Sequence, residues 1–310
     1  MQRLTLAGGI PEAFKGSIVA LGNFDGFHLG HQAVVGRAVQ RAFHERRPAI
    51  VATFDPHPVH FFKPDLPSFR LTTLDQRERL FAHAGADAML VFEFGPELAS
   101  MDAEAFVADV LKQRIGAAGV ITGDDFSFGK GRAGDVALLA RLGTEHGIAA
   151  EAVPQVLLNG ERISSGRIRE ALVAGDSATA THMLSRDFAI EGVVQDGDRR
   201  GRELGYPTAN IALGDYQRPR YGIYAVRATL EDGSEHPGVA SLGVRPTFSP
   251  PVELLETHLL DYEGDLYGQR IEVALHAFIR EEWKFDSVTQ LVDQMRDDEA
   301  DARRLLALQD

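Results

Sequence analysis

The segment "GNFDGFHLGHQ", residues 22–32, decides how the first half of the chain is interpreted. It directly follows the apolar run "SIVAL" (17–21), and it places three glycines and two histidines in eleven positions. Glycine lets a backbone turn sharply and lets a ligand approach it closely. His28 and His31 are three positions apart at the predicted start of a helix, where backbone N–H groups favour anions. The segment predicts a strand-to-helix turn that binds phosphate, which suits transfer of a nucleotidyl group.

The sequence around this turn alternates between short apolar runs and longer stretches of helical period. Buried strands are predicted at 17–21, 49–54, 88–94, 119–123 and 149–153, and helices at 31–45, 74–84, 102–115 and 135–147. Because strands and helices alternate, we expect an α/β fold with a doubly wound parallel sheet.

The period changes in the second half of the chain. After two more helices, at 167–176 and 177–187, strands are predicted at 188–195, 222–230, 236–243, 253–260 and 270–279. Strands at this spacing predict a small antiparallel barrel or sandwich. Val288, Leu291, Val292 and Met295 have helical spacing and predict a C-terminal helix packed on it. We therefore expect two domains, residues 1–184 and 185–310.

Composition excludes several classes of protein. The 310 residues carry a formal charge of −13 with an isoelectric point near 5.3, which argues against nucleic acid or an anionic membrane as partner. The chain contains no cysteine, so disulfides and thiolate chemistry are absent. We find neither a leader-like N-terminus nor a run long enough to span a bilayer, and we expect a cytoplasmic protein.

Other interpretations of the first site stay open. A glycine-rich turn with solvated histidines would look the same in sequence. Zinc is disfavoured, although "HLGH" and "HPVH" (His57 and His60) are both H-x-x-H, because no glutamate lies between the histidines and a proline interrupts the second pair. "GDDFSFGKG" does not have the spacing of a Walker A loop, and no dinucleotide fingerprint follows the first predicted strand.

The second half contains a different group of polar residues. Thr208 and Asn210 follow a proline in "GRELGYPTAN", and their oxygens are hard ligands that suit magnesium shared with phosphates. Glu256 is a candidate general base if its strand face is buried together with Leu254, His258 and Leu260. In the opposite register Leu255, Thr257 and Leu259 face the interior and Glu256 is solvated, and the pattern does not choose between the two.

Four motifs of the first half resemble, in order, those of prokaryotic FAD synthetases, which are nucleotidylyltransferases with a Rossmann-like fold. They are "GNFDGFHLGHQ", "TFDPHP" (53–58), "GDDFSFGKGRAGD" (123–135) and "RISSGRIREAL" (162–172). The resemblance implies that His28, His31 and Arg169 stabilise charge during adenylyl transfer. The expected ATP- and phosphate-binding residues of this domain are Gly22, Asn23, Phe24, Gly30, His57, Asp125, Ser164 and Ser165. From the sequence alone, Asp125 could equally cap a turn, and Gly166 stands where the family usually has Thr.

The second half resembles riboflavin kinases, a family of six-stranded antiparallel barrels. The motifs are "GRELGYPTAN", "GIYAV", "GVASLGVRPTF", "ETHLLDYEGDLYG" and "FIREEWKFDS", with Tyr206 in place of Phe and Ser241 in place of the usual Asn. The resemblance implies that Thr208 and Asn210 bind Mg²⁺ and the nucleotide phosphates, that Gly201 and Gly205 contact ATP, and that Glu256 deprotonates the ribityl hydroxyl.

Over nearly the whole chain the resemblance is to prokaryotic bifunctional riboflavin kinase/FAD synthetases. It implies that riboflavin is phosphorylated to FMN with MgATP, and that FMN is then adenylylated by ATP to FAD with release of pyrophosphate. Two alternatives remain: a riboflavin kinase whose adenylyltransferase domain is impaired, and a flavin-binding protein without turnover.

Overall fold

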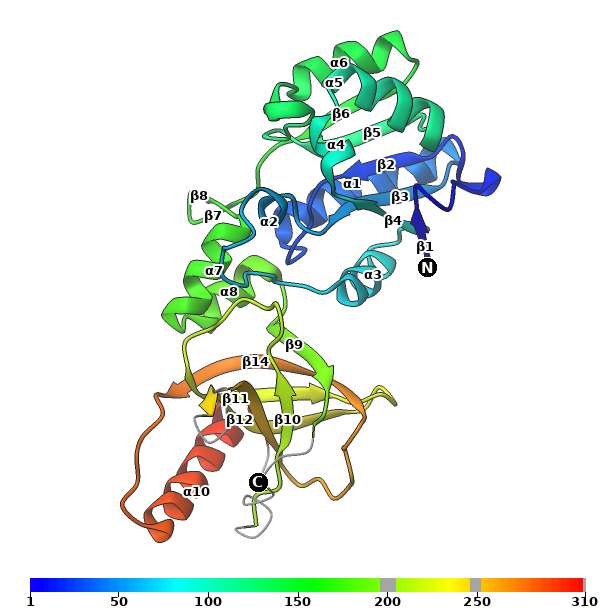
Figure 1. Ribbon diagram of the computed structural model, residues 1–310. Helices are drawn as coiled ribbons and strands as arrows, with labels where there is room; N and C mark the ends of the chain where they lie inside the picture. The colour runs from blue at the N-terminus through cyan, green and yellow to red at the C-terminus, as the bar shows by residue number, and fades with distance from the viewer. Residues whose placement is uncertain (196–204, 246–251, 309–310) are drawn as a thin grey trace. The chain divides into compact units, whose positions relative to one another are not determined.

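The computed structural model describes residues 1–195, 205–245 and 252–308, and the chain forms two compact units (Figure 1). The N-terminal unit contains residues 1–67 and 72–164. The barrel unit contains residues 68–71 and 165–310. The domain boundary predicted at residue 184 stays a prediction.

The N-terminal unit is built on a six-stranded, wholly parallel sheet with the strand order β1-β4-β3-β2-β5-β6. The strands are β1 (Gln2–Thr5), β2 (Ile18–Leu21), β3 (Ala49–Asp55), β4 (Ala88–Glu93), β5 (Gly119–Gly123) and β6 (Ala149–Val153). This confirms the predicted α/β parallel sheet. Two details differ from the prediction: β1 was missed because most of it is exposed, and β6 is half-exposed rather than buried because it is an edge strand.

Helices cover both faces of this sheet, and each face has its own apolar core. The side chains of β2 alternate, so that Ile18 and Ala20 meet α1 (Leu29–Glu45) and α3 (Leu74–His83). Val19 and Leu21 meet the opposite layer, made by the π-helix Phe106–Ile115 and by α6 (Val136–Glu145). The helix expected at 102–115 is therefore a single α-turn, α5 (Ala103–Ala105), that continues as a π-helix.

Short elements complete this unit. They are α2 (Pro58–Phe62), α4 (Pro96–Ser100), the hairpin of β7 (Leu157–Leu158) and β8 (Glu161–Arg162), and the 3-10 turns Glu12–Phe14 and Lys130–Arg132.

The barrel unit is a six-stranded antiparallel sheet with the strand order β10-β13-β12-β11-β14-β9. Its strands are β9 (Phe188–Val193), β10 (Ala209–Ala212), β11 (Gly222–Thr229), β12 (Glu235–Arg245), β13 (Val252–Leu259) and β14 (Arg270–Arg280). The two ends of the sheet approach each other, because the Gln195 amide donates to the Asn210 carbonyl at 2.9 Å. The sheet is thus a nearly closed barrel, as the resemblance to riboflavin kinases implied.

Among the residues that the structure describes, three helices and one inserted segment belong to the barrel unit. The helices are α7 (Ser165–Ala174), α8 (Ser177–Leu184) and α10 (Val288–Leu305). The segment Ser68–Leu71 lies beside residues 215–217: the Arg70 amide donates to the Asp215 carbonyl at 3.0 Å, and the Gln217 amide donates to the Arg70 carbonyl at 2.7 Å. We call this segment the strap.

The C-terminal helix α10 differs in part from its prediction. The helix lies beside the barrel strands (Figure 1). It packs on the barrel through Ala302, beside Ala225, while Leu306 just beyond its end joins the same cluster. Of the four residues expected at the contact, Leu291, Val292 and Met295 are half-buried and Val288 is exposed. Leu291 and Met295 line a pocket instead of filling a core.

Candidate functional sites

The N-terminal candidate site lies where the strand order of the parallel sheet reverses. The chain runs outward from β2 to β3 and β4 on one side and continues with β5 and β6 on the other. Ligands of such sheets bind beyond the carboxyl ends of the strands at this point of reversal. The segment 22–28 leaves the carboxyl end of β2, and Asp125 follows β5, so both lie at this place in the fold.

The turn between β2 and α1 is buried and has an uncommon backbone. Phe24 and Phe27 have left-handed φ values of 51° and 44°, and Gly26 has a φ of 85°. Asp25 is 2% exposed, and its Oδ1 accepts hydrogen bonds from the Thr72 amide at 3.1 Å and the Thr72 hydroxyl at 3.3 Å. The Gly26 amide donates to the Thr72 hydroxyl at 3.0 Å. These bonds hold the backbone in its strained conformation.

The two histidines of the turn form a stacked pair. His28 is the N-cap of α1, and its Nδ1 accepts a hydrogen bond from the His31 amide at 3.3 Å. In the neutral ring the proton is then on Nε2. The two rings stack with centroids 3.6 Å apart, and the Phe24 ring meets His31 edge-on at 5.3 Å. The predicted histidines are therefore side by side at a helix N-terminus, where anions are favoured.

Two glycines make room for this arrangement. A Cβ on Gly30 would lie 3.1 Å from the His28 ring, and one on Gly22 would lie 3.1 Å from the Phe24 ring. The Ile163 carbonyl is 3.9 Å from the same Cβ position on Gly30, which places the start of "ISS" beside the turn. Ser164 follows directly and is half-buried.

The sequence did not predict that Thr53 and Arg77 would bind the backbone carbonyl of Asn23. The Asn23 carbonyl accepts hydrogen bonds from the Thr53 hydroxyl at 2.7 Å and from Arg77 Nη1 at 3.3 Å. Arg77 is 1% exposed and also donates from Nη1 to the Thr53 hydroxyl at 2.9 Å. A helical arginine in "DQRERL" looks like an ordinary solvated charge, so the sequence carried no signal for this role.

We expect Arg77→Met to destabilise the chain and to slow the chemistry of the N-terminal site. The change removes the Arg77 donor from the buried Thr53 hydroxyl and from the Asn23 carbonyl, which keeps only its bond from Thr53, and this loss costs about 1–3 kcal/mol in unfolding free energy. Thermal unfolding measures this loss. Arg79→Met on the same helix, where the side chain is less buried, is the control, and equal melting temperatures for the two variants would contradict the prediction.

The remaining predicted residues of this unit lie in loops beyond the carboxyl ends of β3 and β5. His57 is the N-cap of α2 and its Nδ1 accepts a hydrogen bond from the Val59 amide at 3.2 Å. Asp125 is ion-paired with Arg162, so this carboxylate joins the loop after β5 to the β7–β8 hairpin. A nucleotide contact by Asp125 remains a prediction.

Ser165 and Arg169 are in the barrel unit, on α7. Ser165 is its first residue, and Gly166 is exposed in its first turn. Arg169 Nε donates to the Phe69 carbonyl at 2.7 Å, and its guanidinium carbon lies 4.8 Å from the centre of the Phe69 ring. The strap therefore orients the arginine that the resemblance assigns to pyrophosphate.

The barrel candidate site is organised by one row of residues across five neighbouring strands. Cross-strand pairing joins Asn210 to Glu256, Glu256 to Ser241, Ser241 to Ile223 and Ile223 to Arg280. Residues paired in this way point to the same face of a sheet. The row faces outward, because the interior positions of β13 are Leu255, Thr257 and Leu259. The second register considered for β13 is thus the observed one, but Glu256 is half-buried in a pocket instead of solvated.

This larger pocket has a volume of about 650 Å³, which is in the usual range for a site of a cofactor-sized ligand. Its apolar wall is made by Tyr206, Ile223, Val239, Trp283, Phe285, Leu291 and Met295, and its polar lining includes Thr208, Ser241, Glu256, Arg280 and Glu282. The pocket is enclosed by the barrel exterior, the segment 282–285 and the first turns of α10. A flat aromatic molecule with a polar chain matches these walls.

Ion pairs and hydrogen bonds fix the walls of the larger pocket. Arg280 Nε donates to Oδ1 of Asp298 at 2.7 Å and Nη2 donates to Oδ2 at 2.5 Å, and Asp298 is 3% exposed. This bidentate pair joins β14 to α10. Ser241 Oγ donates to Glu282 Oε1 at 2.9 Å. Burial raises the pKa of Tyr206, and the charge of Glu299 acts in the same direction.

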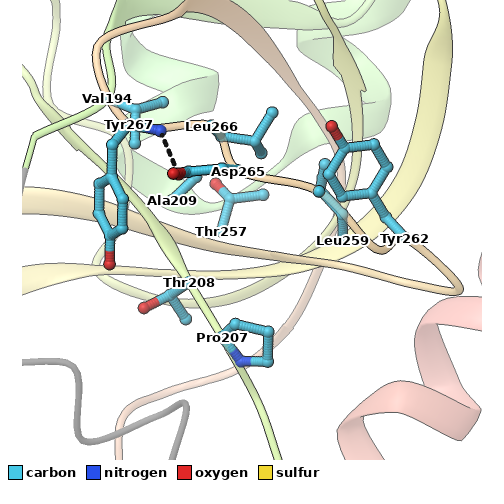
Figure 2. A pocket seen from close by; sticks show the side chains of 11 residues that line it. Val194, Pro207, Thr208, Ala209, Thr257, Leu259, Tyr262, Asp265, Leu266 and Tyr267 are labelled. Carbon is cyan, nitrogen blue, oxygen red and sulfur yellow. Dashed lines mark hydrogen bonds between the residues drawn. The ribbon is translucent and has the colours of Figure 1, made fainter.

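A smaller pocket of about 50 Å³ lies beside β10 and β13 (Figure 2). Its lining comprises Val194, Pro207, Thr208, Ala209, Thr257, Leu259, Tyr262, Gly264, Asp265, Leu266 and Tyr267. Thr208 lines both pockets, so one hydroxyl is placed between them. Asn210 is 6% exposed, and its Oδ1 makes no hydrogen bond with any residue that the structure describes. Gly205 has a φ of 85°, and Gly201 lies outside the described residues.

Taken together, a parallel α/β unit with a phosphate-type turn and a barrel with a carboxylate in an aromatic pocket define a transferase with two domains. A family model described as FAD synthetase matches residues 10–167, and one described as riboflavin kinase matches residues 184–306. The chain belongs to the family of bifunctional riboflavin kinase/FMN adenylyltransferases.

Individual relatives agree with the family models. The bifunctional riboflavin kinase/FMN adenylyltransferase of Pseudomonas fluorescens is 40% identical over 94% of each chain. That of Escherichia coli K12 is 38% identical over 95% of this chain and 94% of its own. A crystal structure from Streptococcus pneumoniae, described as a macrolide-efflux protein, superimposes with a TM-score of 0.87 at 30% identity and covers 98% of this chain and 99% of its own.

Among the helices of residues 1–195, 205–245 and 252–308, none has the length and apolar character that crossing a membrane requires.

Proposed function

We propose that this chain converts riboflavin to FMN and FMN to FAD, with ATP as the donor in both steps. The matches to a FAD synthetase model and a riboflavin kinase model, end to end along the chain, carry this proposal. We assign adenylyl transfer to residues 1–184 and phosphorylation to residues 185–310.

In the kinase step, riboflavin occupies the larger pocket, and part of ATP enters the smaller one, whose volume of about 50 Å³ is too small for the whole nucleotide. The aromatic and aliphatic side chains of the larger pocket suit the flavin ring, and Glu256 lies in the same pocket. Glu256 takes the proton of the terminal ribityl hydroxyl while that oxygen bonds to the γ-phosphorus of ATP. The bond from this phosphorus to the β-phosphate oxygen breaks, and ADP leaves. Thr208 lines both pockets and therefore suits contact with the transferred phosphate.

ATP-dependent families of this kind need a divalent metal, and we propose Mg²⁺ at Thr208 and Asn210. The donor set fits, because both side chains offer hard neutral oxygens and Asn210 Oδ1 is buried without a hydrogen bond to the described residues. Bound there with the ATP phosphates, the ion would offset their negative charge. The two side chains would orient the phosphates toward Glu256.

In the adenylyl step, a phosphate oxygen of FMN bonds to the α-phosphorus of ATP, and pyrophosphate leaves. No protein nucleophile is required. His28, His31 and Arg169 stabilise the charge on the phosphates, and Ser164, Ser165 and the backbone of residues 22–24 and 30 position them. His57 and Asp125 complete the proposed ATP site, as Gly201 and Gly205 do in the kinase domain.

A time course with purified protein, riboflavin and MgATP tests the proposal, with the flavins separated by chromatography. We expect FMN to form first and FAD afterwards, and we expect chelation of the metal to stop FMN formation. A reaction that ends at FMN would support a kinase with an impaired adenylyltransferase domain. Bound flavin with no ATP consumption would overturn the proposal in favour of a binding protein.

A further inference from the structure

Thr257 is a buried hydroxyl that the mechanism above does not use. It is 1% exposed, and its Oγ1 makes no hydrogen bond with any part of the chain that the structure describes. The side chain lines the smaller pocket, where Figure 2 shows it between Ala209 and Leu259. A buried polar atom that has no partner lowers stability, and each such group calls for an explanation.

Packing alone would favour another residue at this position. Thr257 is paired with Ala209 on β10 and with Ala240 on β12, and both neighbours are apolar and buried. Leu255 and Leu259, on the same face of β13, are also buried. Valine has the same shape as threonine, prefers strands and carries no polar atom. Core packing therefore gives no reason for a hydroxyl at this position, whereas a ligand in the pocket would.

The position of Thr257 relates it to the donor nucleotide. The smaller pocket that Thr257 lines is also lined by Thr208, which we assign to the ATP phosphates. Glu256 precedes Thr257 and points to the opposite face, into the larger pocket. Consecutive residues of β13 therefore face the two pockets, and Thr208, which we assign to the ATP phosphates, lines both of them.

We propose, on the basis of the kinase function above, that Thr257 is a nucleotide-binding residue whose hydroxyl forms a hydrogen bond with the part of ATP that enters the smaller pocket. Binding supplies the partner that the hydroxyl lacks in the protein alone. The residue therefore lowers stability in the unliganded chain and increases affinity in the complex.

The test is a pair of substitutions in the full-length chain, Thr257→Val and Thr257→Ser. We expect Thr257→Val to raise the melting temperature of the chain without ligand. We expect it also to raise the Kd for MgADP, and the KM for ATP in FMN formation, by about fivefold to tenfold, which corresponds to the loss of one hydrogen bond. Thr257→Ser keeps the hydroxyl and should keep the affinity. FAD formation from supplied FMN should not change in either variant.

Ser17→Ala is the matched control, because Ser17 is also fully buried and its Oγ also makes no hydrogen bond with the described residues. It precedes β2, at the opposite end of the strand from the histidine turn. We expect it to raise the melting temperature without changing nucleotide affinity. If Thr257→Val binds MgADP as tightly as the unaltered chain does, the inference is wrong. If the unaltered chain binds MgADP but forms no FMN, the kinase proposal fails while the binding comparison still tests Thr257.

Discussion

A His28→Ala variant is expected to form FMN at the unaltered rate and to form FAD at least about 100-fold more slowly, the usual loss when one donor to a developing charge is removed. His28 is the residue that joins the turn after β2 to α1, and its ring stacks on His31. Removing it takes away one of the two imidazoles that we assign to the ATP phosphates. Flavin chromatography, started once from riboflavin and once from FMN, measures the two steps separately.

His28 also caps α1, so its loss has a structural component. Loss of an N-cap costs about 1 kcal/mol in unfolding free energy. His28→Asn separates the two roles, because asparagine is a good N-cap but cannot act as an imidazole. We expect His28→Asn to recover the stability and not the FAD synthesis. His44→Ala, at the exposed C-terminal end of the same helix, should change neither. Full activity in His28→Asn would mean that capping is the whole role of His28.

A Glu256→Gln variant is expected to lose riboflavin phosphorylation by about 100-fold to 10,000-fold, the usual contribution of a general base. Glutamine has the same size and can still form hydrogen bonds from its place beside Asn210 and Ser241, but it cannot accept the ribityl proton. The loss should appear in kcat, because the shape of the pocket is retained. Adenylylation of supplied FMN should continue.

Glu235→Gln is the control for charge, since Glu235 is an exposed carboxylate at the start of β12. It should leave both reactions unchanged. Unaltered FMN synthesis in Glu256→Gln would remove Glu256 as the base, although the binding assignment of the pocket would stand.

The parts of the structure that the sequence predicted well are those with strong periodicity. The parallel sheet follows from β-branched runs separated by helical stretches, and the turn at 22–32 follows from its glycines. The pairing of His28 with His31 needed only their spacing and the helix start. These features depend on residues that are near one another in the chain.

Features that depend on distant residues could not be predicted. Arg77 is more than fifty positions from Asn23, and nothing local distinguishes it from a solvated arginine. The environment of Glu256 depends on α10 and on the segment 282–285, which together turn an outward strand face into a pocket. The spacing of apolar residues in α10 predicted the helix and its apolar face. Periodicity cannot tell whether such a face packs against a core or lines a cavity.

The strap has a consequence for anyone who wishes to study the two activities in separate fragments. Because Ser68–Leu71 belongs to the barrel unit, the backbone passes between the units three times, near residues 67, 71 and 164, and no single cut divides them. A fragment that starts at residue 165 lacks the strap, so the Asp215 carbonyl and the Gln217 amide each lose a backbone partner and Arg169 loses the Phe69 carbonyl. Dissection by simple truncation therefore alters the piece it is meant to isolate, and point variants in the intact polypeptide are the better tool.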